Sequence, residues 1–389
     1  MNFNLFTPTK LLFGCGKLNE LGKQTMPGKK ALLLISNGNS VRTTGILSRT
    51  VEQLDEANVT YVLCDNIHEN PSKEVVMEAA TIARENKCDF ILALGGGAVL
   101  DSAVAVAAMA TNSGDLWDYV YGGTGKAQPL QYPGLPIVTI ATTSGTGSEI
   151  NCWGVISNHE TKEKIGFGTP ELNPVLAIVD PELMCTVPAK YTAYQGFDAL
   201  FHNTEVMISR FVNVLSEPIA LSAIEHITKY LPRAVQNGND IEAREAVAYG
   251  STIAGLTMQL TSTTAEHSME HAMSAFHNTL PHGAGLIMIS NEFYRFFVEK
   301  HACDEQFIKM ARAMGEKEAS KPEDFLIALA KLQNACGVNN LKMSDYGIKR
   351  EECSTLAYNA YETMGGLFAA NPCEMTHEDC VSIFERAYR

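Results

Sequence analysis

The sequence predicts an α/β domain built on a parallel sheet, followed by an all-helical domain. Three observations predict this fold class. Short apolar runs alternate with helical stretches between residues 31 and 180, such runs become rare after Pro181, and the chain of 389 residues is longer than one hydrophobic core usually serves. We expect the first domain to cover residues 1–185 and the second to cover residues 186–389.

Five apolar runs in the first half have the length and composition of buried strands. They cover residues 31–35, 59–63, 90–94, 137–140 and 175–179. Helix-length segments separate these runs, and strands joined through helices pair in parallel. Near-continuous apolar runs also indicate that helices cover both faces of the sheet.

The second half favours helices, because long segments rich in Ala, Leu, Met and Glu replace the β-branched runs. The predicted helices cover residues 190–210, 216–231, 241–277 and 285–299, with further helices after them. Neither an internal repeat nor a long flexible linker interrupts the chain. We therefore expect the two domains to pack closely and to share a ligand-binding cleft.

Charge and composition exclude several classes of partner. The net charge of −14 opposes binding to nucleic acid, which depends on Lys and Arg displacing counterions from phosphates. The N-terminal residues lack a basic segment followed by an apolar one, and no apolar run reaches membrane-spanning length. The ten cysteines form no C-x-x-C pair, which is typical of thiols in a reducing compartment. We expect a soluble cytoplasmic protein that binds no membrane.

A glycine-rich turn follows the apolar run 90–94. Gly95, Gly96 and Gly97 lead into an Ala-rich segment, and Asp101 falls in the first turn of the predicted helix. Glycines let a pyrophosphate approach the main chain, and a helix N-terminus offers free N–H groups and a positive dipole end. A tight strand-to-helix turn without a ligand is the alternative interpretation.

A second polar loop, ATTSGTGSE, follows the run 137–140, and its hydroxyl groups cluster around two glycines. Open α/β sheets bind ligands at the carboxyl ends of their strands, so the two loops together predict one dinucleotide crevice. A hydroxyl-rich turn is the simpler alternative. The first run ends in Ser36 to Ser40 without the acidic residue that often holds the ribose of NAD; with Arg42 nearby, this favours NADP(H).

Carboxylate and imidazole side chains recur at helical spacing in the second half. Asp198 and His202 lie four residues apart, His267 and His271 repeat that spacing, and His282 follows. One carboxylate with several imidazoles suits Fe²⁺ or Zn²⁺ and not Ca²⁺ or Mg²⁺. A divalent ion held in this way lowers the pKa of a bound alcohol or polarises a carbonyl. Any single histidine of this set could instead be structural.

Several motifs together resemble the iron-containing alcohol dehydrogenase family, also called group III, over nearly the whole chain. In chain order they are PTKLLFGCGKLNELG, GGGAVLD, TTSGTGSE, AIVDPEL, GFDALFH, H-x-x-x-H with LPHG, and NPCEMTHEDC. The resemblance implies a Rossmann-like N-terminal domain, a helical C-terminal domain as in the dehydroquinate synthase-like fold, a metal in their cleft, and a homo-oligomer, usually a dimer.

The resemblance also implies roles for individual residues. The metal ligands would be Asp198, His202, His267 and His282, and His271 would assist proton transfer. The cofactor-binding residues would be Gly38, Ser40, Asn70, Gly96, Gly97, Asp101, Thr142, Thr143, Thr146, Lys164 and Leu183. The chain departs from the family pattern at Ala98, Asn151 and Trp153, and it has one extra residue before His282 in LPHG.

The implied activity is hydride transfer between NAD(P)(H) and a small primary alcohol or aldehyde, with Fe²⁺ as the expected metal and Zn²⁺ or another divalent ion as alternatives. A polyol or glycerol-type dehydrogenase of the same fold, or a catalytically silent member that binds NAD(P)H, are the competing hypotheses. The ligand set of one Asp and three His favours an alcohol dehydrogenase, as does the scarcity of Lys and Arg around the site.

Overall fold

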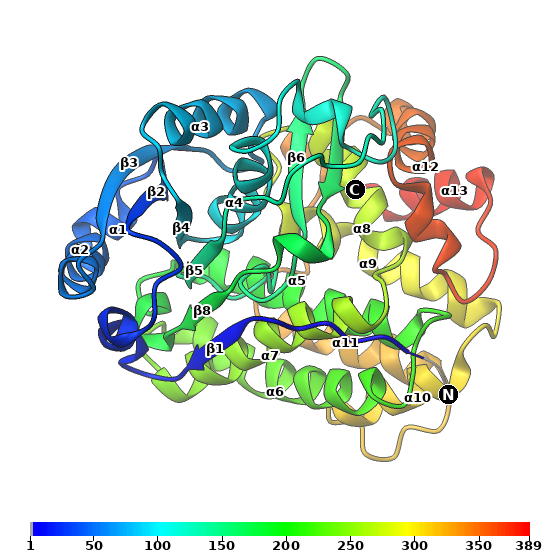
Figure 1. Cartoon of the computed structure of the whole chain (residues 1–389). Helices are drawn as coiled ribbons and strands as arrows, with labels where there is room; N and C mark the ends of the chain where they lie inside the picture. The colour runs from blue at the N-terminus through cyan, green and yellow to red at the C-terminus, as the bar shows by residue number, and fades with distance from the viewer. Residues whose placement is uncertain (1–2) are drawn as a thin grey trace.

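The computed structural model describes residues 3–389 and contains a six-stranded sheet in its first half (Figure 1). All pairings in this sheet are parallel. The strand order is β1 (Lys10–Phe13), β8 (Leu176–Val179), β5 (Ile137–Ala141), β4 (Phe90–Gly95), β2 (Lys30–Ser36) and β3 (Thr60–Ile67). The predicted parallel sheet is confirmed, and each of the five predicted runs overlaps a strand, with residues 59 and 175 lying just before β3 and β8.

Helices pack on both faces of this sheet. They are α1 (Ser40–Thr43), α2 (Ile46–Glu56), α3 (Lys73–Glu85) and α4 (Gly97–Met109). Helix α4 contacts β4 and β5 on one side and α3 on another, so every residue from Val99 to Met109 is buried. This environment explains the Ala- and Val-rich sequence of the helix, which is apolar on all its faces.

A two-stranded antiparallel hairpin, β6 (Gly154–Asn158) and β7 (Glu163–Phe167), stands apart from the main sheet and was not predicted. Its sequence contains polar residues at buried positions, including Glu163 and Lys164, so no apolar alternation marks it. Helix α4 contacts β6, and helix α8 of the second half contacts β7. The hairpin therefore joins the two halves of the chain.

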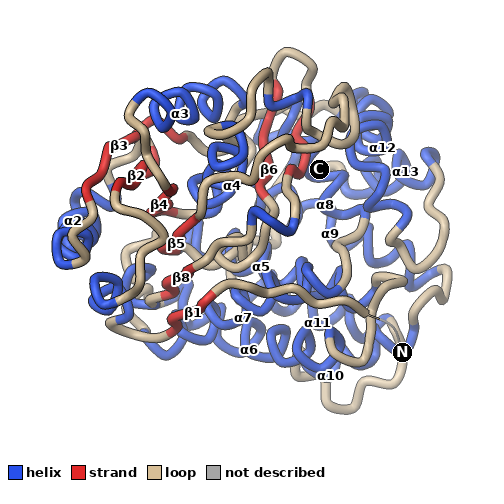
Figure 2. The backbone as a smooth tube through the Cα atoms, viewed as in Figure 1, coloured by secondary structure: helices blue, strands red, loops and turns tan. Residues whose placement is uncertain are grey.

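The second half is helical, as predicted, and Figure 2 shows its helices gathered on one side of the strands. The helices are α5 (Ala189–Ile208), α6 (Ser216–Gln236), α7 (Ile241–Leu260), α8 (Ala265–Phe276), α9 (His282–Glu299), α10 (Asp304–Ala313), α11 (Glu323–Ala335), α12 (Cys353–Ala369) and α13 (His377–Ala387). Their core includes the fully buried rings of Phe197, Tyr294 and Phe325. In residues 3–389, no helix combines the length and the hydropathy needed to cross a membrane.

Several helix boundaries differ from the prediction, and α6 extends to Gln236, five residues beyond residue 231. The segment 241–277 is not one helix, because α7 ends at Leu260 and α8 starts at Ala265. The backbone N–H and the hydroxyl of Thr264 both donate to the carboxylate of Glu205, which competes with helical hydrogen bonding. Helix α9 begins at His282, three residues earlier than predicted, because Pro281 sets its start. The division into two domains after residue 185 stays a prediction.

Candidate functional site

Asp198 and His202 lie one turn apart on one face of α5, which packs between α6, α7 and α9. Both side chains are buried. Oδ1 of Asp198 lies 3.3 Å from Nδ1 of His202. Nδ1 of His202 also lies 2.9 Å from the carbonyl oxygen of Asp198. Because a carbonyl oxygen only accepts, this ring donates through Nδ1 and keeps the lone pair on Nε2.

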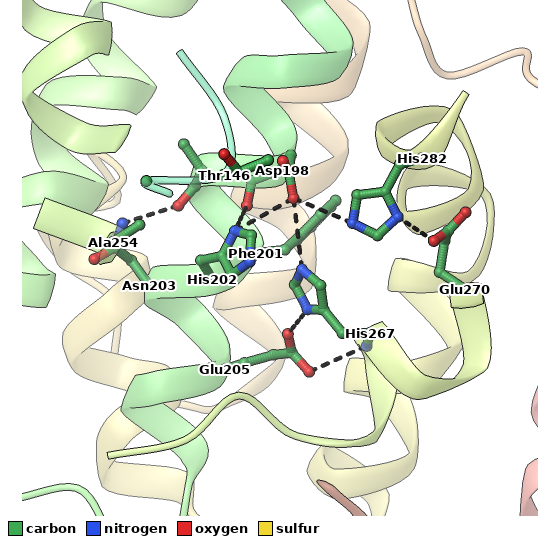
Figure 3. Close-up of polar contacts among 12 residues, drawn as sticks. Thr146, Asp198, Phe201, His202, Asn203, Glu205, Ala254, His267, Glu270 and His282 are labelled. Atoms are coloured by element: carbon green, nitrogen blue, oxygen red, sulfur yellow. Dashed lines mark hydrogen bonds and ion pairs between the residues drawn. The ribbon is translucent and has the colours of Figure 1, made fainter. Parts of the chain in front are cut away.

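Two further histidines converge on the same carboxylate from other helices (Figure 3). Nε2 of His267, on α8, and Nε2 of His282, the first residue of α9, each lie 3.5 Å from Oδ1 of Asp198. The donor atoms of these three residues all lie within 4.8 Å of one another. His202 falls outside this group of three, although its ring centroid is 4.1 Å from that of His267.

Two buried glutamates orient these histidines, and the sequence motifs do not indicate either of them. Nδ1 of His267 donates to Glu205 on α5, and Nδ1 of His282 donates to Glu270 on α8 (Figure 3). Each bond leaves Nε2 of the ring directed toward Asp198. The available signal is spacing: Glu205 lies two turns after Asp198, and Glu270 lies one turn after His267.

The charges around the site favour a cation. Burial alone would raise the pKa of Asp198, but His202, His267 and His282 hold it well below its usual value. Burial and the neighbouring imidazoles lower the pKa of His202 to about 3, so this ring is neutral near pH 7. Burial would also lower the pKa of His267, yet the carboxylates of Glu205 and Asp198 raise it to about 10. The carboxylates thus stabilise positive charge at this point.

The donor atoms at the centre of the cluster fit a divalent metal. Oδ1 of Asp198 and Nε2 of His267 are both buried, and neither has a hydrogen-bond partner within residues 3–389. Buried polar atoms without partners are costly, and metal coordination would satisfy both of them. The set of one carboxylate oxygen and imidazole nitrogens suits Fe²⁺ or Zn²⁺.

His271 lies beside this cluster, one turn after His267 on α8. It is buried, its ring centroid is 5.4 Å from that of His282, and its Nδ1 lies 2.9 Å from Sδ of Met364. Burial and the nearby charge of Lys164 lower the pKa of His271 well below its usual value. His271 faces the same cleft as the cluster.

A cleft of about 730 Å³ runs from the end of the sheet to the histidine cluster. Expected cofactor residues lining it are Gly38, Ser40, Asn70, Gly96, Gly97, Asp101, Thr142, Thr143, Thr146 and Lys164. Leu183 is the exception, because it is buried in the core with Leu176 and Ile178 and does not border the cleft. The role of Leu183 in cofactor binding stays a prediction.

The two polar loops at the carboxyl ends of β4 and β5 pack against each other. A Cβ atom on Gly97 would lie 2.5 Å from Cγ2 of Thr146, so only glycine allows this contact at the start of α4. Ser148 Oγ donates to Oδ1 of Asp101 at 2.6 Å, and the backbone N–H of Val155 donates to Oδ2 at 3.1 Å. Asp101 is buried, which raises its pKa to about 6. Through these two hydrogen bonds, Asp101 on α4 fixes the positions of the second polar loop and of β6.

Asn70 and Arg42 make contacts that the sequence does not indicate. The side-chain amide of Asn70 donates to the carbonyl oxygens of Asn278, at 2.9 Å, and Leu280, at 3.4 Å. It thereby fixes the turn that leads to His282. Arg42 forms an ion pair with Asp65 at the surface and does not line the cleft.

All three substituted positions that depart from the family pattern, Ala98, Asn151 and Trp153, also border the cleft. Asn151 Nδ2 donates to the carbonyl of Gly147 at 3.0 Å, and its Oδ1 accepts from the N–H of Trp153 at 2.8 Å. Asn151 therefore shapes the turn that ends the second polar loop. Trp153 and Ala98 complete this stretch of the wall.

Sequence comparison identifies related enzymes over the whole chain. Residues 8–181 match the family described as iron-containing alcohol dehydrogenase, and residues 192–388 match the C-terminal part of the Fe-containing alcohol dehydrogenase family. A probable NADH-dependent butanol dehydrogenase of Bacillus subtilis (strain 168) is 32% identical over 368 residues, 92% of this chain and 93% of the relative. A 1,3-propanediol dehydrogenase of Klebsiella pneumoniae is 30% identical over 393 residues, 99% of each chain.

Structural comparison gives the same result. An archaeal halo-thermophilic alcohol dehydrogenase from a Red Sea brine pool superposes with a TM-score of 0.94 at 31% identity, covering 100% of this chain and 99% of the other. A 1,3-propanediol oxidoreductase superposes with a TM-score of 0.90 at 30% identity and covers 100% of both chains. The chain belongs to the iron-containing alcohol dehydrogenase family.

Proposed function

We propose that this protein is a metal-dependent alcohol dehydrogenase or aldehyde reductase that acts on small primary alcohols and aldehydes with a nicotinamide dinucleotide. The observation that carries the proposal is the position of Oδ1 of Asp198 with Nε2 of His267 and His282, at one end of a cleft that begins at a glycine-rich helix N-terminus. The names of the relatives support the substrate class, since they include butanol and 1,3-propanediol dehydrogenases.

We propose Asp198, His202, His267 and His282 as the residues that hold the metal, with Fe²⁺ as the expected ion. A divalent cation in this position would polarise the oxygen of an alcohol or aldehyde, and a bound nicotinamide would carry the hydride. Glu205 keeps Nε2 of His267 directed toward Oδ1 of Asp198. His271 would exchange the proton at the substrate oxygen through Nε2, because its Nδ1 contacts Met364.

The choice between NAD(H) and NADP(H) is a separate proposal. The loop Ser36 to Ser40 borders the cleft and carries no carboxylate that would repel a 2′-phosphate, which supports NADP(H). The names of three relatives state NADH, and the pairing of Arg42 with Asp65 removes part of the positive charge on which a preference for NADP(H) depends. We also propose that the protein forms a homo-oligomer, a dimer in its simplest form. Light scattering on the purified protein tests this proposal.

Anaerobic reconstitution tests the proposed function. Metal-free protein loaded in turn with Fe²⁺, Zn²⁺ and Co²⁺ is mixed with butanal or 1,3-propanediol and with NADH, NADPH or their oxidised forms. We expect turnover, followed by nicotinamide absorbance, only in loaded samples. Asp198→Asn is the matched control, because it keeps the size of the side chain and removes its charge. Loaded wild-type protein that turns over none of these substrates would overturn the proposal, and turnover of glycerol alone would favour a polyol dehydrogenase.

A further inference from the structure

Glu270 is a buried carboxylate at an unspecified position of the H-x-x-x-H motif, and three polar groups surround it. Nδ1 of His282 and Nζ of Lys164, the latter at 3.4 Å, both meet its Oε2. Ser274 Oγ donates to its Oε1. The side chain is fully buried, so these groups provide all the solvation of its charge.

The two nitrogen groups that meet Oε2 of Glu270 come from different parts of the site. Lys164 lies on β7, in the hairpin attached to α4, and it borders the cofactor cleft. His282 lies at the start of α9 and directs Nε2 toward Asp198. Glu270 is the single acceptor for the ammonium of Lys164 within residues 3–389. The carboxylate of Glu270 therefore contacts both Lys164, in the wall of the cofactor cleft, and His282, a proposed metal ligand.

The packing of α8 against α9 leaves room for the side chain of Glu270 only because residue 285 is glycine. A Cβ atom on Gly285, one turn into α9, would lie 2.7 Å from Cγ of Glu270 and 2.8 Å from its Oε1. A residue with a side chain at this position would push the carboxylate away from the ring of His282. The close approach of the two helices thus depends on glycine, and it places Oε2 at Nδ1 of His282.

A second metal site is the competing interpretation of the same residues. Glu270, His271 and His282 each offer a donor atom, and these atoms lie within 4.8 Å of one another. However, Nδ1 of His282 already donates to Glu270, and the ammonium of Lys164 lies 3.4 Å from the oxygen that a cation would need. A second cation there would face like charge at short range, which is strongly unfavourable in a buried site.

We infer that Glu270 is a positioning residue that links the metal-binding part of the site to the cofactor-binding part. It holds His282 with Nε2 toward Asp198, and it holds Lys164 in the wall of the cofactor cleft. The inference rests on the proposed function. It implies that loss of this one carboxylate weakens metal binding and dinucleotide binding together. A carboxylate that only supported the fold would affect neither in a folded variant.

Two binding measurements on Glu270→Gln test this inference. Metal-free protein is titrated with Co²⁺, which reports affinity and the visible absorption spectrum of the bound ion, and NADH binding to metal-free protein is followed by fluorescence. We expect Co²⁺ affinity to fall by about 10- to 100-fold with an altered spectrum, as is typical when the partner of a ligating histidine is lost. We also expect weaker NADH binding, because Lys164 loses its anchor.

Two further variants separate the roles of the residues. Lys164→Met leaves the bond from His282 to Glu270 in place, so we expect weaker NADH binding with a wild-type Co²⁺ spectrum. Glu149→Gln is the matched control, because it removes another buried acidic side chain, which bonds to Thr252 and contacts neither Lys164 nor His282. We expect both measurements to stay within about twofold of wild type. If Glu270→Gln does not fold, Glu270→Asp replaces it, since the shorter side chain keeps the charge and alters the reach to both partners.

Several outcomes would overturn the inference. Folded Glu270→Gln with wild-type Co²⁺ affinity and spectrum would show that His282 needs no such partner. Binding of two Co²⁺ ions to wild-type protein and one to Glu270→Gln would make Glu270 a ligand instead. Because both measurements follow binding and not turnover, wild-type protein that binds Co²⁺ and NADH without reducing any aldehyde would overturn the proposed function alone.

Discussion

Nδ1 of His267 on α8 donates a hydrogen bond to the carboxylate of Glu205 on α5. The same carboxylate accepts bonds from the N–H and the hydroxyl of Thr264, so it also fixes the turn that precedes α8. Glu205 lies two turns beyond Asp198, and its side chain is fully buried. A single glutamate therefore sets both the start of α8 and the direction in which His267 presents Nε2.

We expect Glu205→Gln to bind metal about 10- to 100-fold more weakly than wild type, because a neutral amide orients and polarises the ring of His267 less strongly. Equilibrium dialysis against buffered Zn²⁺ measures the change. Glu149→Gln is the control, since Glu149 is also buried but bonds to Thr252 away from the cluster. Equal affinities for wild type and Glu205→Gln would show that this hydrogen bond does not support the metal site.

Asp198→Ala and His267→Ala should each lose the metal and nearly all activity, since Oδ1 of Asp198 is the point on which the imidazoles converge. Metal analysis of purified, reconstituted protein and a steady-state assay check this. The control is His159→Ala, which removes an exposed histidine of the β6–β7 hairpin. Full activity in either ligand variant would refute the ligand assignment.

His271→Ala should keep its metal and slow turnover by about 10²- to 10⁴-fold, the range typical of a lost proton carrier. His271 borders the cleft, but it is not part of the group formed by Asp198, His267 and His282. Metal content and kcat are measured on the same preparation. Loss of the metal in this variant would instead make His271 a ligand.

The main features of the fold follow from local sequence. Buried parallel strands need near-continuous apolar runs, and each of the five runs in the first half overlaps a strand of the sheet. The β6–β7 hairpin carries no such signal, because its buried Glu163 and Lys164 are stabilised by partners far away in the chain. The break between α7 and α8 has the same origin, since Glu205 captures Thr264. Contacts between distant residues are not visible in a local pattern.

The contrast between local sequence patterns and long-range contacts also holds at the candidate site. Asp198, His202, His267 and His282 were indicated by helical spacing and by motifs, and the structure brings them together. Glu205 and Glu270 were not indicated, because a glutamate within a helix is common on exposed faces and only tertiary packing buries these two. Leu183 illustrates the opposite case, in which a residue within a family-like motif packs into the core.

Asp65→Asn should shift cofactor preference toward NADPH. In the structure Arg42 is paired with Asp65, and loss of that carboxylate would free the guanidinium for a 2′-phosphate at the nearby Ser36–Ser40 loop. Exposed pairs are worth about 0–1 kcal/mol, so we expect up to a fivefold change in the ratio of kcat/KM for NADPH and NADH. Arg42→Ala should move the ratio the other way. An unchanged ratio in both variants would exclude Arg42 from cofactor choice.

Glu163→Gln should lower the stability of the protein in a pH-dependent way. The carboxylate of Glu163 accepts hydrogen bonds from Nε1 of Trp117 at 2.8 Å, from the hydroxyl of Thr124 at 2.6 Å and from that of Thr161 at 2.7 Å. Burial alone would raise the pKa of Glu163, but these bonds lower it below the usual value of 4.5. The ionised form is thus stabilised more in the folded protein than in the unfolded chain.

Because folding lowers the pKa of Glu163, its ionised carboxylate stabilises the folded protein above pH 4.5. This stability is lost as the pH falls through the pKa of Glu163 in the folded state. We expect Glu163→Gln to reduce the free energy of unfolding by about 1.5–3 kcal/mol at pH 7, the range for hydrogen bonds to a charged group. The difference from wild type should shrink as the pH is lowered below 4.5, because protonation removes the same charge from wild-type protein. Urea unfolding at a series of pH values measures this difference in the free energy of unfolding.

Glu171→Gln, at an exposed position, is the control and should show a much smaller difference at pH 7. A Glu163→Gln difference that stays constant across the series would show that the charge of Glu163 does not stabilise the hairpin.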